Sequence, residues 1–286
     1  MIVTIVGVGL IGGSIALDLK SRGFATHVIG VDIDKQNGSE AVALGVVDEM
    51  MKLDKAIAVS DIIIISIPVK ATTELLPLIL DRVRPTTIVT DVGSTKKNIC
   101  LAVRKHKNRS QYVAFHPIAG TENSGAKAAL NNLFDTKIGI ICERSRSNPK
   151  AVKIIEKMLK TLNMQLLFME ADSHDIHVAY VSHMPHVISY VLAETVLEVE
   201  KSAATIFNLA GSGFASTARL AKSPASMWGP IFEQNSKHIS KALDVYIKNL
   251  KRFKKSIDKK DVATMQQDIT SANRIRKVLE RIQTKR

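Results

Sequence analysis

The first thirteen residues constrain the fold of this chain more than any other stretch. An apolar, β-branched run, Met1–Val6, leads directly into Gly7-Val8-Gly9-Leu10-Ile11-Gly12-Gly13, and helix-forming residues follow. In a strand–turn–helix unit, Gly7 allows a tight turn, Gly9 lets the backbone approach a pyrophosphate, and Gly12 lets the helix pack closely on the strand. The helix N-terminus offers free N–H groups and the positive end of its dipole to the phosphates. The pattern predicts a dinucleotide-binding unit, and a glycine-rich turn without a ligand is the alternative.

An acidic residue follows the next apolar run, where such a unit binds ribose. Residues His27–Val31 predict a second strand, which ends at Asp32. A carboxylate at this point accepts hydrogen bonds from the ribose hydroxyls of NAD and repels the 2′-phosphate of NADP. We therefore expect NAD as the cofactor, with Leu10 and Ile11 beside the glycines in the same site. Asp34 is a weaker candidate for the ribose contact, and a turn residue is its alternative role.

The chain divides into two parts by the period of its apolar residues. Up to about residue 170, short apolar runs alternate with helical patterns, which predicts βαβ units and a mostly parallel, doubly wound sheet. Beyond residue 171, strand signals almost vanish and helical patterns dominate. We expect an α/β chain with an N-terminal doubly wound Rossmann domain (1–170) and a C-terminal all-helical domain (171–286). The later strands are expected at 61–66, 87–91, 112–115, 137–142 and 165–168, and the helices at 39–44, 71–83, 96–106, 150–162, 173–199, 202–209, 227–257 and 258–282.

The net charge of +13 makes a nucleic-acid partner worth testing against the sequence. Residues 241–286 contain 14 of the 40 Lys and Arg residues and only 5 acidic ones, spread along helical patterns. Aromatic residues make up 5% of the chain, and none alternates with the basic residues to stack on bases. We therefore expect a solvated basic helical face and no nucleic-acid partner.

The cysteines and the longest apolar run indicate the cellular compartment of the protein. Cys100 and Cys142 have no metal-binding or redox spacing, so we expect both to be reduced and structural, as suits the cytoplasm. The sequence begins directly with a strand, which leaves no room for a signal peptide. The longest apolar run, Ile62–Val69, is far shorter than the ~18 residues of a membrane span. The sequence therefore indicates a cytoplasmic protein without a membrane partner.

Polar residues follow three of the expected strands, at the edge where ligands of open α/β sheets bind. Ser66 and Pro68 follow one strand and are expected to contact the cofactor. His116 follows another, and its neutral imidazole is suited to accept a proton from a substrate hydroxyl while hydride leaves the same molecule. A turn histidine is the alternative. Ser94 is suited to orient that hydroxyl, although Ser94 or Thr95 is equally suited to cap the next helix.

Two charged residues near this edge have less specific signals. Lys96 is expected either to touch the pyrophosphate or to face water. Glu122, which follows Thr121, is expected to bond a substrate group or to bridge the cleft, and a surface acid is the alternative.

Histidines cluster at the start of the helical part. On an uninterrupted α-helix, Asp175, Ser182 and His186 lie within about 40° of one another, and His183 lies about 80° from Asp175. Clustered histidines are common metal ligands, but the i, i+4 pair of a metalloprotease helix is absent. We therefore expect anion or carboxylate binding and no metal, and we expect Pro185 to kink the helix.

Two residues further along complete the set of candidates. Arg219 has the fork of donors that suits a carboxylate, with a solvated helix arginine as the alternative. Trp228 is the only tryptophan, and a core position is its more frequent role.

Together these segments resemble the prephenate/arogenate dehydrogenases of tyrosine biosynthesis. The resemblance covers essentially the whole chain, and its most specific parts are His116-Pro117-Ile118-Ala119-Gly120-Thr121-Glu122 and Ser182-His183-Met184-Pro185-His186. It implies a Rossmann domain and a helical dimerisation domain that forms a homodimer, with the active site between the two domains. The implied activity is the NAD-dependent oxidative decarboxylation of prephenate to 4-hydroxyphenylpyruvate.

The resemblance also implies roles for single residues. His116 matches the catalytic histidine, Ser94 the serine that orients the hydroxyl, and Arg219 the arginine that binds a carboxylate. The remaining matches are on the substrate side: Thr121, Glu122, His183, His186 and Trp228. Two departures, Ser212 in a motif that is often Gly-Gly-Gly-Phe and Pro224 where Ser-Asp-Pro is frequent, leave the shape of the loop near Arg219 open.

The choice of substrate depends on two of these residues. Arogenate-specific members can lack the second histidine of the Ser-His-x-Pro-His segment and the acid after Gly-Thr, whereas this chain has His186 and Glu122. Prephenate is therefore favoured, and an arogenate or dual cyclohexadienyl dehydrogenase is the alternative. A β-hydroxyacid-type dehydrogenase is more distant, because it would need a lysine in the helical part where this chain has histidines.

Overall fold

The computed structural model describes residues 1–200 and 206–283, which belong to two compact units, 1–235 and 236–286. The expected domain boundary at 170/171 lies inside the first of these units and stays a prediction. The first unit contains a sheet of eight strands: β1 (Ile2–Val6), β2 (His27–Val31), β3 (Glu49–Met50), β4 (Ile62–Ile65), β5 (Ile88–Asp91), β6 (Tyr112–Pro117), β7 (Ile138–Cys142) and β8 (Gln165–Met169).

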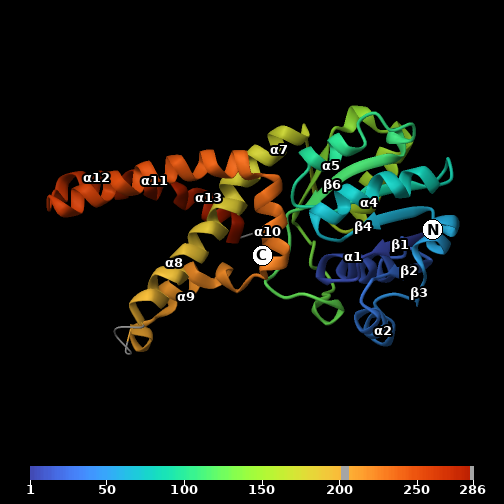
Figure 1. The fold of residues 1–286 in the computed structure, drawn as a ribbon, viewed down its shortest axis with the longest axis horizontal. Helices are drawn as coiled ribbons and strands as arrows, with labels where there is room; N and C mark the ends of the chain where they lie inside the picture. Colours follow the sequence, from blue (N-terminus) through green and yellow to red (C-terminus); the bar gives the residue numbers. More distant parts are fainter. Residues whose placement is uncertain (201–205, 284–286) are drawn as a thin grey trace. The chain divides into compact units, whose positions relative to one another are not determined.

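The sheet has the doubly wound architecture that the alternating pattern predicts (Figure 1). Its strand order is β3-β2-β1-β4-β5-β6-β7-β8, and every neighbouring pair is parallel except β6 and β7. The strand order reverses between β1 and β4, because the sheet continues from β1 toward β3 on one side and from β4 toward β8 on the other. Such a reversal opens a ligand-binding crevice at the carboxyl ends of β1 and β4. The helices that cover the sheet are α1 (Leu10–Ser21), α2 (Lys35–Ala43), α3 (Leu53–Val59), α4 (Val69–Arg82), α5 (Lys97–Ala102) and α6 (Pro149–Thr161).

Burial on both faces explains the near-continuous apolar strands. The four residues of β4 have no exposed surface, and they alternate between two hydrophobic clusters. One cluster contains residues of α1 and α6, and the other contains residues of α4 and α5. Removing four isoleucine side chains from water stabilises the sheet by about 1.5–3 kcal/mol each. The expected helix at 96–106 is shorter in the structure, because α5 ends at Ala102.

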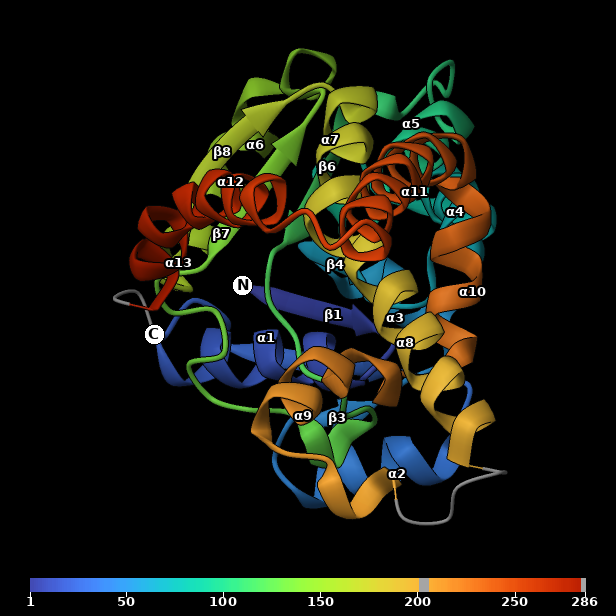
Figure 2. The ribbon, with the colours of Figure 1, turned by 90° about the vertical axis from the view of Figure 1, so that its left-hand side faces the viewer.

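The first unit continues in helices: α7 (Ala171–Val178), a π-helical turn (Ala179–His183), α8 (Met184–Glu200), α9 (Ser212–Ala218) and α10 (Ala225–Gln234). No strand follows β8 in the part of the chain that the structure describes. Figure 2 shows α8 and α9 side by side. Of the expected helix at 202–209, residues 202–205 lie outside the described residues, and 206–209 form a short 3₁₀ turn.

The expected single helix at 173–199 is wrong, because the π-helical turn interrupts it. Pro185 lacks an N–H group, so the preceding turn cannot form all its ordinary hydrogen bonds, and a wider turn accommodates the gap. The extra residue in that turn also rotates all later side chains about the helix axis, relative to those before the turn. The 40° face predicted for an uninterrupted helix therefore does not apply beyond Val178.

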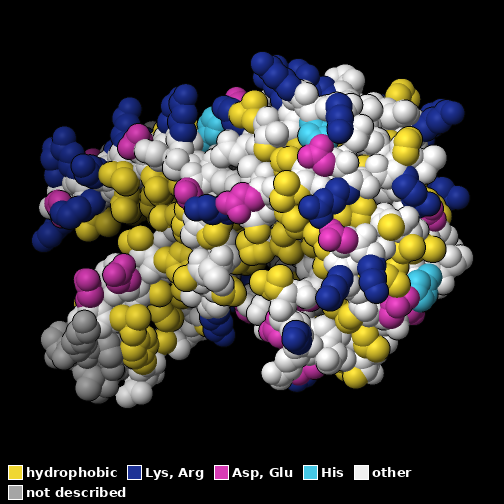
Figure 3. Space-filling view, turned by 45° about the vertical axis from the view of Figure 1, so that its right-hand side comes forward, with side chains coloured by type: hydrophobic (Ala, Val, Ile, Leu, Met, Phe, Trp, Pro, Cys, Tyr) yellow, Lys and Arg dark blue, Asp and Glu magenta, His cyan; other side chains and the backbone are white. Residues whose placement is uncertain are grey.

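The second unit contains α11 (Ser236–Asp258), α12 (Val262–Ala272) and α13 (Arg276–Gln283). Large apolar side chains remain exposed on these helices, among them Leu250, Ile257, Val262 and Val278. Figure 3 shows Lys and Arg side chains along one edge of this helical unit and hydrophobic side chains along another. Among the described residues, no helix is both long and apolar enough to cross a membrane.

Candidate active site

The glycine-rich turn has the close contacts that its sequence predicts. Gly7 has φ +91°, and a Cβ there would lie 2.4 Å from the carbonyl oxygen of Ser66. A Cβ on Gly12 would lie 2.3 Å from the carbonyl oxygen of Gly7. Gly9 differs, because a Cβ there would meet nothing within 4 Å. The open space in front of Gly9, at the N-terminus of α1, fits a pyrophosphate.

Asp32 is held rigidly at the end of β2. Its Oδ2 accepts hydrogen bonds from the Val8 N–H at 3.0 Å and from Asn37 Nδ2 at 2.9 Å, and its Oδ1 accepts one from the Asp34 N–H at 2.9 Å. Each carboxylate oxygen accepts two hydrogen bonds, so Oδ1 retains capacity for a ribose hydroxyl. For Asp34 we expected a ribose contact or a turn, and in the structure its carboxylate caps α2 by accepting from the Gln36 N–H.

The other predicted cofactor residues lie around this turn. Leu10 is the first residue of α1 and is buried, whereas Ile11 is half-buried. Ser66 is half-buried after β4, and its N–H donates to the Val6 carbonyl. Pro68 is exposed at the start of α4. The structure thus brings the predicted residues of β1, α1 and β4 together at one edge of the sheet.

His116 lies within β6 and is 8% exposed. Its Nδ1 lies 2.8 Å from Nε2 of His174, whose Nδ1 lies 2.7 Å from Oδ1 of Asp175. A carboxylate only accepts, so His174 donates from Nδ1 and, as a neutral ring, accepts at Nε2. His116 must therefore donate from Nδ1, which leaves its Nε2 as an unprotonated acceptor. The three side chains together fix the tautomer that a general base needs.

Asp175 also caps helix α5. Its Oδ1 accepts from the Lys96 N–H at 2.8 Å and its Oδ2 from the Lys97 N–H at 3.0 Å. The alternative role of Ser94 or Thr95 as the cap of this helix is therefore wrong, because a carboxylate from α7 accepts from those N–H groups. The hydroxyl of Ser94 has no hydrogen-bond partner among the residues described, and it remains available to a substrate.

Lys96 corrects a second expectation. It neither faces water nor points to the pyrophosphate, because its side chain is completely buried. The ammonium group pairs with the buried carboxylate of Asp91 and donates to the Phe115 carbonyl at 2.7 Å. Tyr112 completes this group, since its hydroxyl donates to Asp91 at 2.6 Å. A buried charge needs such partners, and one of them is the carbonyl of Phe115, the residue before His116.

The buried surroundings keep the histidines neutral. Burial lowers the pKa of His116 well below its usual range, and His174 and Lys96 lower it further. Burial also lowers the pKa of His183 to about 4, although the charge of Asp175 opposes the shift. At neutral pH, His116 is therefore an uncharged base.

A second group of rings surrounds Trp228. The ring of His186 stacks on the indole with 3.5 Å between centroids, and that of His183 meets it edge-on at 5.8 Å. Nδ1 of His183 bonds Asn235 at 3.0 Å. The Nε2 of His183 and the Nε1 of Trp228 are buried and have no hydrogen-bond partner among the described residues. Since buried polar groups are rarely unpaired, these two nitrogens are candidates to bind a polar ligand.

Arg219 and Glu122 meet at the exposed side of this group. Their side chains form an ion pair at 3.1 Å and are 50% and 27% exposed. The 3₁₀ turn Arg219–Lys222 packs against α8, the helix that contains His186. Burial lowers the pKa of His186, and the charge of Arg219 adds to the lowering. His183 likewise adds to the lowering of the pKa of His116, after burial. Hydrogen bonds connect His116 to His183 through His174, Asp175 and Asn235. Ring contacts continue from His183 to Trp228 and His186, and the turn that contains Arg219 packs on the helix of His186.

Thr121 stabilises the turn beside Glu122, and two further residues of the site were not predicted from the sequence. The hydroxyl of Thr121 accepts from the Asn123 N–H at 3.2 Å, which stabilises the turn that holds Glu122. His174 and Asn235 were not singled out from the sequence. The signal for His174 was its place beside Asp175, because an adjacent acid often fixes the orientation of an imidazole. Asn235 had no such signal.

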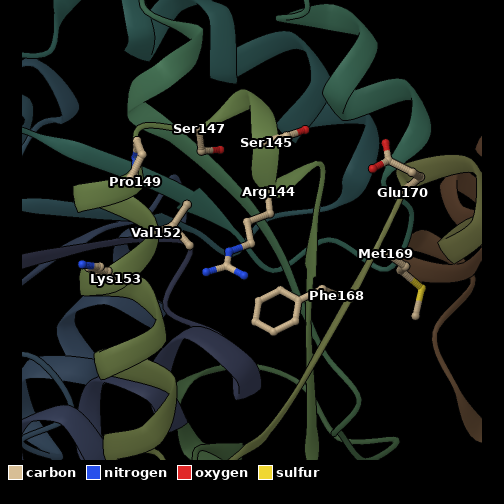
Figure 4. Close-up of a pocket in the computed structure, with 9 residues that line it drawn as sticks. All are labelled: Arg144, Ser145, Ser147, Pro149, Val152, Lys153, Phe168, Met169 and Glu170. Carbon is tan, nitrogen blue, oxygen red and sulfur yellow. The ribbon is translucent and has the colours of Figure 1, made fainter.

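A pocket of about 570 Å³ lies elsewhere in the first unit, between α6 and β8 (Figure 4). The guanidinium group of Arg144 lies over the ring of Phe168 there, 4.8 Å from its centroid, and Val152 forms part of the wall. None of the predicted site residues lines it. The candidate site is therefore the cluster around His116 and not this pocket.

A glycine-rich turn, an acid after the second strand and a neutral histidine at the sheet edge define a dinucleotide-dependent dehydrogenase. The chain belongs to the prephenate dehydrogenase family. The model of the family's nucleotide-binding domain matches residues 15–168, and that of its dimerization domain matches residues 170–283.

Single relatives agree with this assignment. The chain is 29% identical to the prephenate dehydrogenase of Bacillus subtilis (strain 168), over 92% of this chain and 72% of that protein. The crystal structure of prephenate dehydrogenase from A. aeolicus in complex with hydroxyphenyl propionate and NAD⁺ is similar with a TM-score of 0.90 and 29% identity, over 98% of each chain. Synechocystis arogenate dehydrogenase is similar with a TM-score of 0.78 and 26% identity, over 98% of this chain and 100% of that one.

Proposed function

We propose that this protein is an NAD⁺-dependent prephenate dehydrogenase, which converts prephenate to 4-hydroxyphenylpyruvate and CO₂. The observation that supports it most is the His116–His174–Asp175 chain. It leaves a neutral acceptor nitrogen at the edge of a dinucleotide-binding sheet. Arg219, in a turn that packs on α8, is the candidate cation. Oxidation of a hydroxyl group needs a base that accepts its proton, and a substrate with carboxylates needs a cation that binds it.

His116 acts as the general base. Its Nε2 accepts the proton of the 4-hydroxyl group of prephenate, while NAD⁺, when bound, accepts the hydride from the same carbon. His174 and Asp175 are positioning residues, because they hold the Nδ1–H of His116 and stabilise the imidazolium as it forms. The ring carboxylate then leaves as CO₂, and aromatisation of the ring makes the reaction irreversible.

The remaining candidates hold the substrate so that the reacting carbon faces the cofactor, which is a positioning role. Arg219 bonds one carboxylate through the N–H groups that its pair with Glu122 does not use. The N–H groups of His183 and Trp228 face the substrate as donors, because both are buried without another partner among the described residues. Ser94 orients the 4-hydroxyl group toward His116.

The protein is also proposed to act as a homodimer through its helical part. Exposed apolar side chains such as Leu250, Ile257 and Val278 support this, as does the match to a dimerization domain. Sedimentation equilibrium that gives the mass of a single chain would contradict it. Cytoplasmic localisation is proposed on the two free, buried cysteines, Cys100 and Cys142, which suit a reducing compartment.

The test is NADH formation by the purified protein with prephenate or arogenate, and with NAD⁺ or NADP⁺. We expect prephenate with NAD⁺ to give the highest kcat/KM. Faster turnover of arogenate would favour the alternative function, to which the similarity with the Synechocystis enzyme points. The absence of NADH with both substrates would overturn the proposal.

A further inference from the structure

The connection between β6 and β7, residues 118–137, is bonded to the first two helices of the sheet. The Leu130 N–H donates to Ser14 Oγ on α1 at 2.9 Å, and Lys127 pairs with Glu40 on α2 at 2.9 Å. Figure 2 shows this connection, drawn in green, beside α1. The same connection contains Glu122, so the loop on the substrate side is attached to the helices that build the cofactor site.

Asn37 on α2 joins these two regions through a single amide group. Its Nδ2 donates to the Val8 carbonyl at 3.0 Å and to Asp32 Oδ2 at 2.9 Å. Its Oδ1 accepts from the Ala126 N–H at 2.8 Å. The partners determine the orientation of the amide, because two oxygens face the nitrogen and one N–H group faces the oxygen.

We propose that Asn37 is a positioning residue that couples the ribose site to the substrate-side loop, so that NAD⁺ and prephenate binding depend on one shared anchor. The proposal rests on the proposed function for the identity of both ligands. A ribose that bonds Asp32 restrains the carboxylate that Asn37 already holds. The same planar amide then restrains Ala126, four residues after Glu122.

The side-chain chemistry explains why an asparagine is needed. The site requires two donors and one acceptor on a short, planar group, and asparagine has all of these. Aspartate has no donor for the Val8 carbonyl or for Asp32, and alanine has neither donor nor acceptor. Asn37 is also half-buried, so water replaces its bonds incompletely.

Two variants separate coupling from simple stability. Asn37→Ala removes all three hydrogen bonds. Gly125→Ala strains the loop beside the anchor but leaves both donor bonds of Asn37 in place, because Gly125 has φ +83° and an added Cβ would lie 3.4 Å from Asn37 Oδ1. Ser39→Ala is the control, since its exposed side chain is on the same helix and donates to the Lys35 carbonyl of that helix, at 2.9 Å.

Three quantities are measured for each variant: KM for prephenate at saturating NAD⁺, Kd for NAD⁺ by calorimetry, and Tm. We expect Asn37→Ala to raise KM for prephenate about tenfold and Kd for NAD⁺ several-fold, with kcat nearly unchanged. Gly125→Ala should raise KM for prephenate more than Kd for NAD⁺, and Ser39→Ala should change neither constant. An unchanged KM for prephenate in a folded Asn37→Ala protein would overturn the proposal, as would a loss of kcat alone.

Amide hydrogen exchange tests the same coupling without turnover. Addition of NAD⁺ to the wild-type protein should slow exchange in residues 118–130, and this protection should be lost in Asn37→Ala at a saturating NAD⁺ concentration. Equal protection in both proteins would contradict the role of Asn37. If NAD⁺ protects the loop of the wild-type protein but the protein does not oxidise prephenate, the proposed function is wrong while the coupling role of Asn37 is retained.

Discussion

Replacement of His174 by phenylalanine tests the arrangement behind the catalytic base. Phenylalanine fills a similar space but removes the bond of 2.8 Å to His116 and the bond of 2.7 Å to Asp175. Two buried polar groups then lose a partner, at about 1–3 kcal/mol each. Asp175 keeps its bonds to two backbone N–H groups of α5, so we expect the free energy of unfolding to fall by about 2–4 kcal/mol.

The effect on catalysis should be larger than the effect on binding. His116 loses the acceptor that fixes its tautomer, and general-base catalysis contributes about 10²- to 10⁴-fold to a rate. We expect kcat to fall by about 100-fold at the lower end of that range, with KM for prephenate within about threefold of the wild type. His177→Phe is the matched control, because it makes the same change at an exposed position on α7. A folded His174→Phe protein with the kcat of the control would refute the reasoning.

Three further predictions concern the same cluster. His116→Asn should leave the Kd for NAD⁺ intact and lower kcat by about 10²- to 10⁴-fold, and unchanged turnover would remove His116 from the mechanism. Arg219→Ala should mainly raise KM for prephenate, whereas a change confined to NAD⁺ affinity would show that Arg219 is misplaced. Stability should fall below pH 6.5, because the unfolded chain binds protons there that the buried histidines do not. For His183, with a pKa of about 4, the loss reaches about 3 kcal/mol by pH 4. Urea unfolding at pH 5 and pH 7 measures this loss of unfolding free energy. The difference between the two pH values should be smaller in His183→Gln than in the wild type, and equal differences would contradict the lowered pKa of His183.

The parts of the fold that depend on neighbouring residues in the chain could be predicted from the sequence. The turn at Gly7 and the alternation of strands and helices both follow from local spacing. The expected Rossmann architecture is confirmed, because apolar strands separated by helical patterns have few other ways to bury both faces.

The parts that depend on distant residues could not be predicted in this way. The bond between His116 and His174 joins residues 58 positions apart, and no local pattern indicates it. The burial of Lys96 follows from its partner Asp91, whereas a lysine after a strand is ordinarily solvated. The π-helical turn before Pro185 depends on how the helix accommodates a missing N–H, so the assumption of 100° per residue was wrong there.

The reversal of direction at β7 has a consequence for how such an enzyme diversifies. A parallel successor to β6 would have required a crossover to the opposite end of the sheet. Because β7 runs antiparallel, both ends of residues 118–137 are at the same end of the sheet, where the connection is bonded to α1 and α2. Replacement of this connection by that of a relative would therefore also break its bonds to Ser14, Asn37 and Glu40, so the connection and the two helices have to change together.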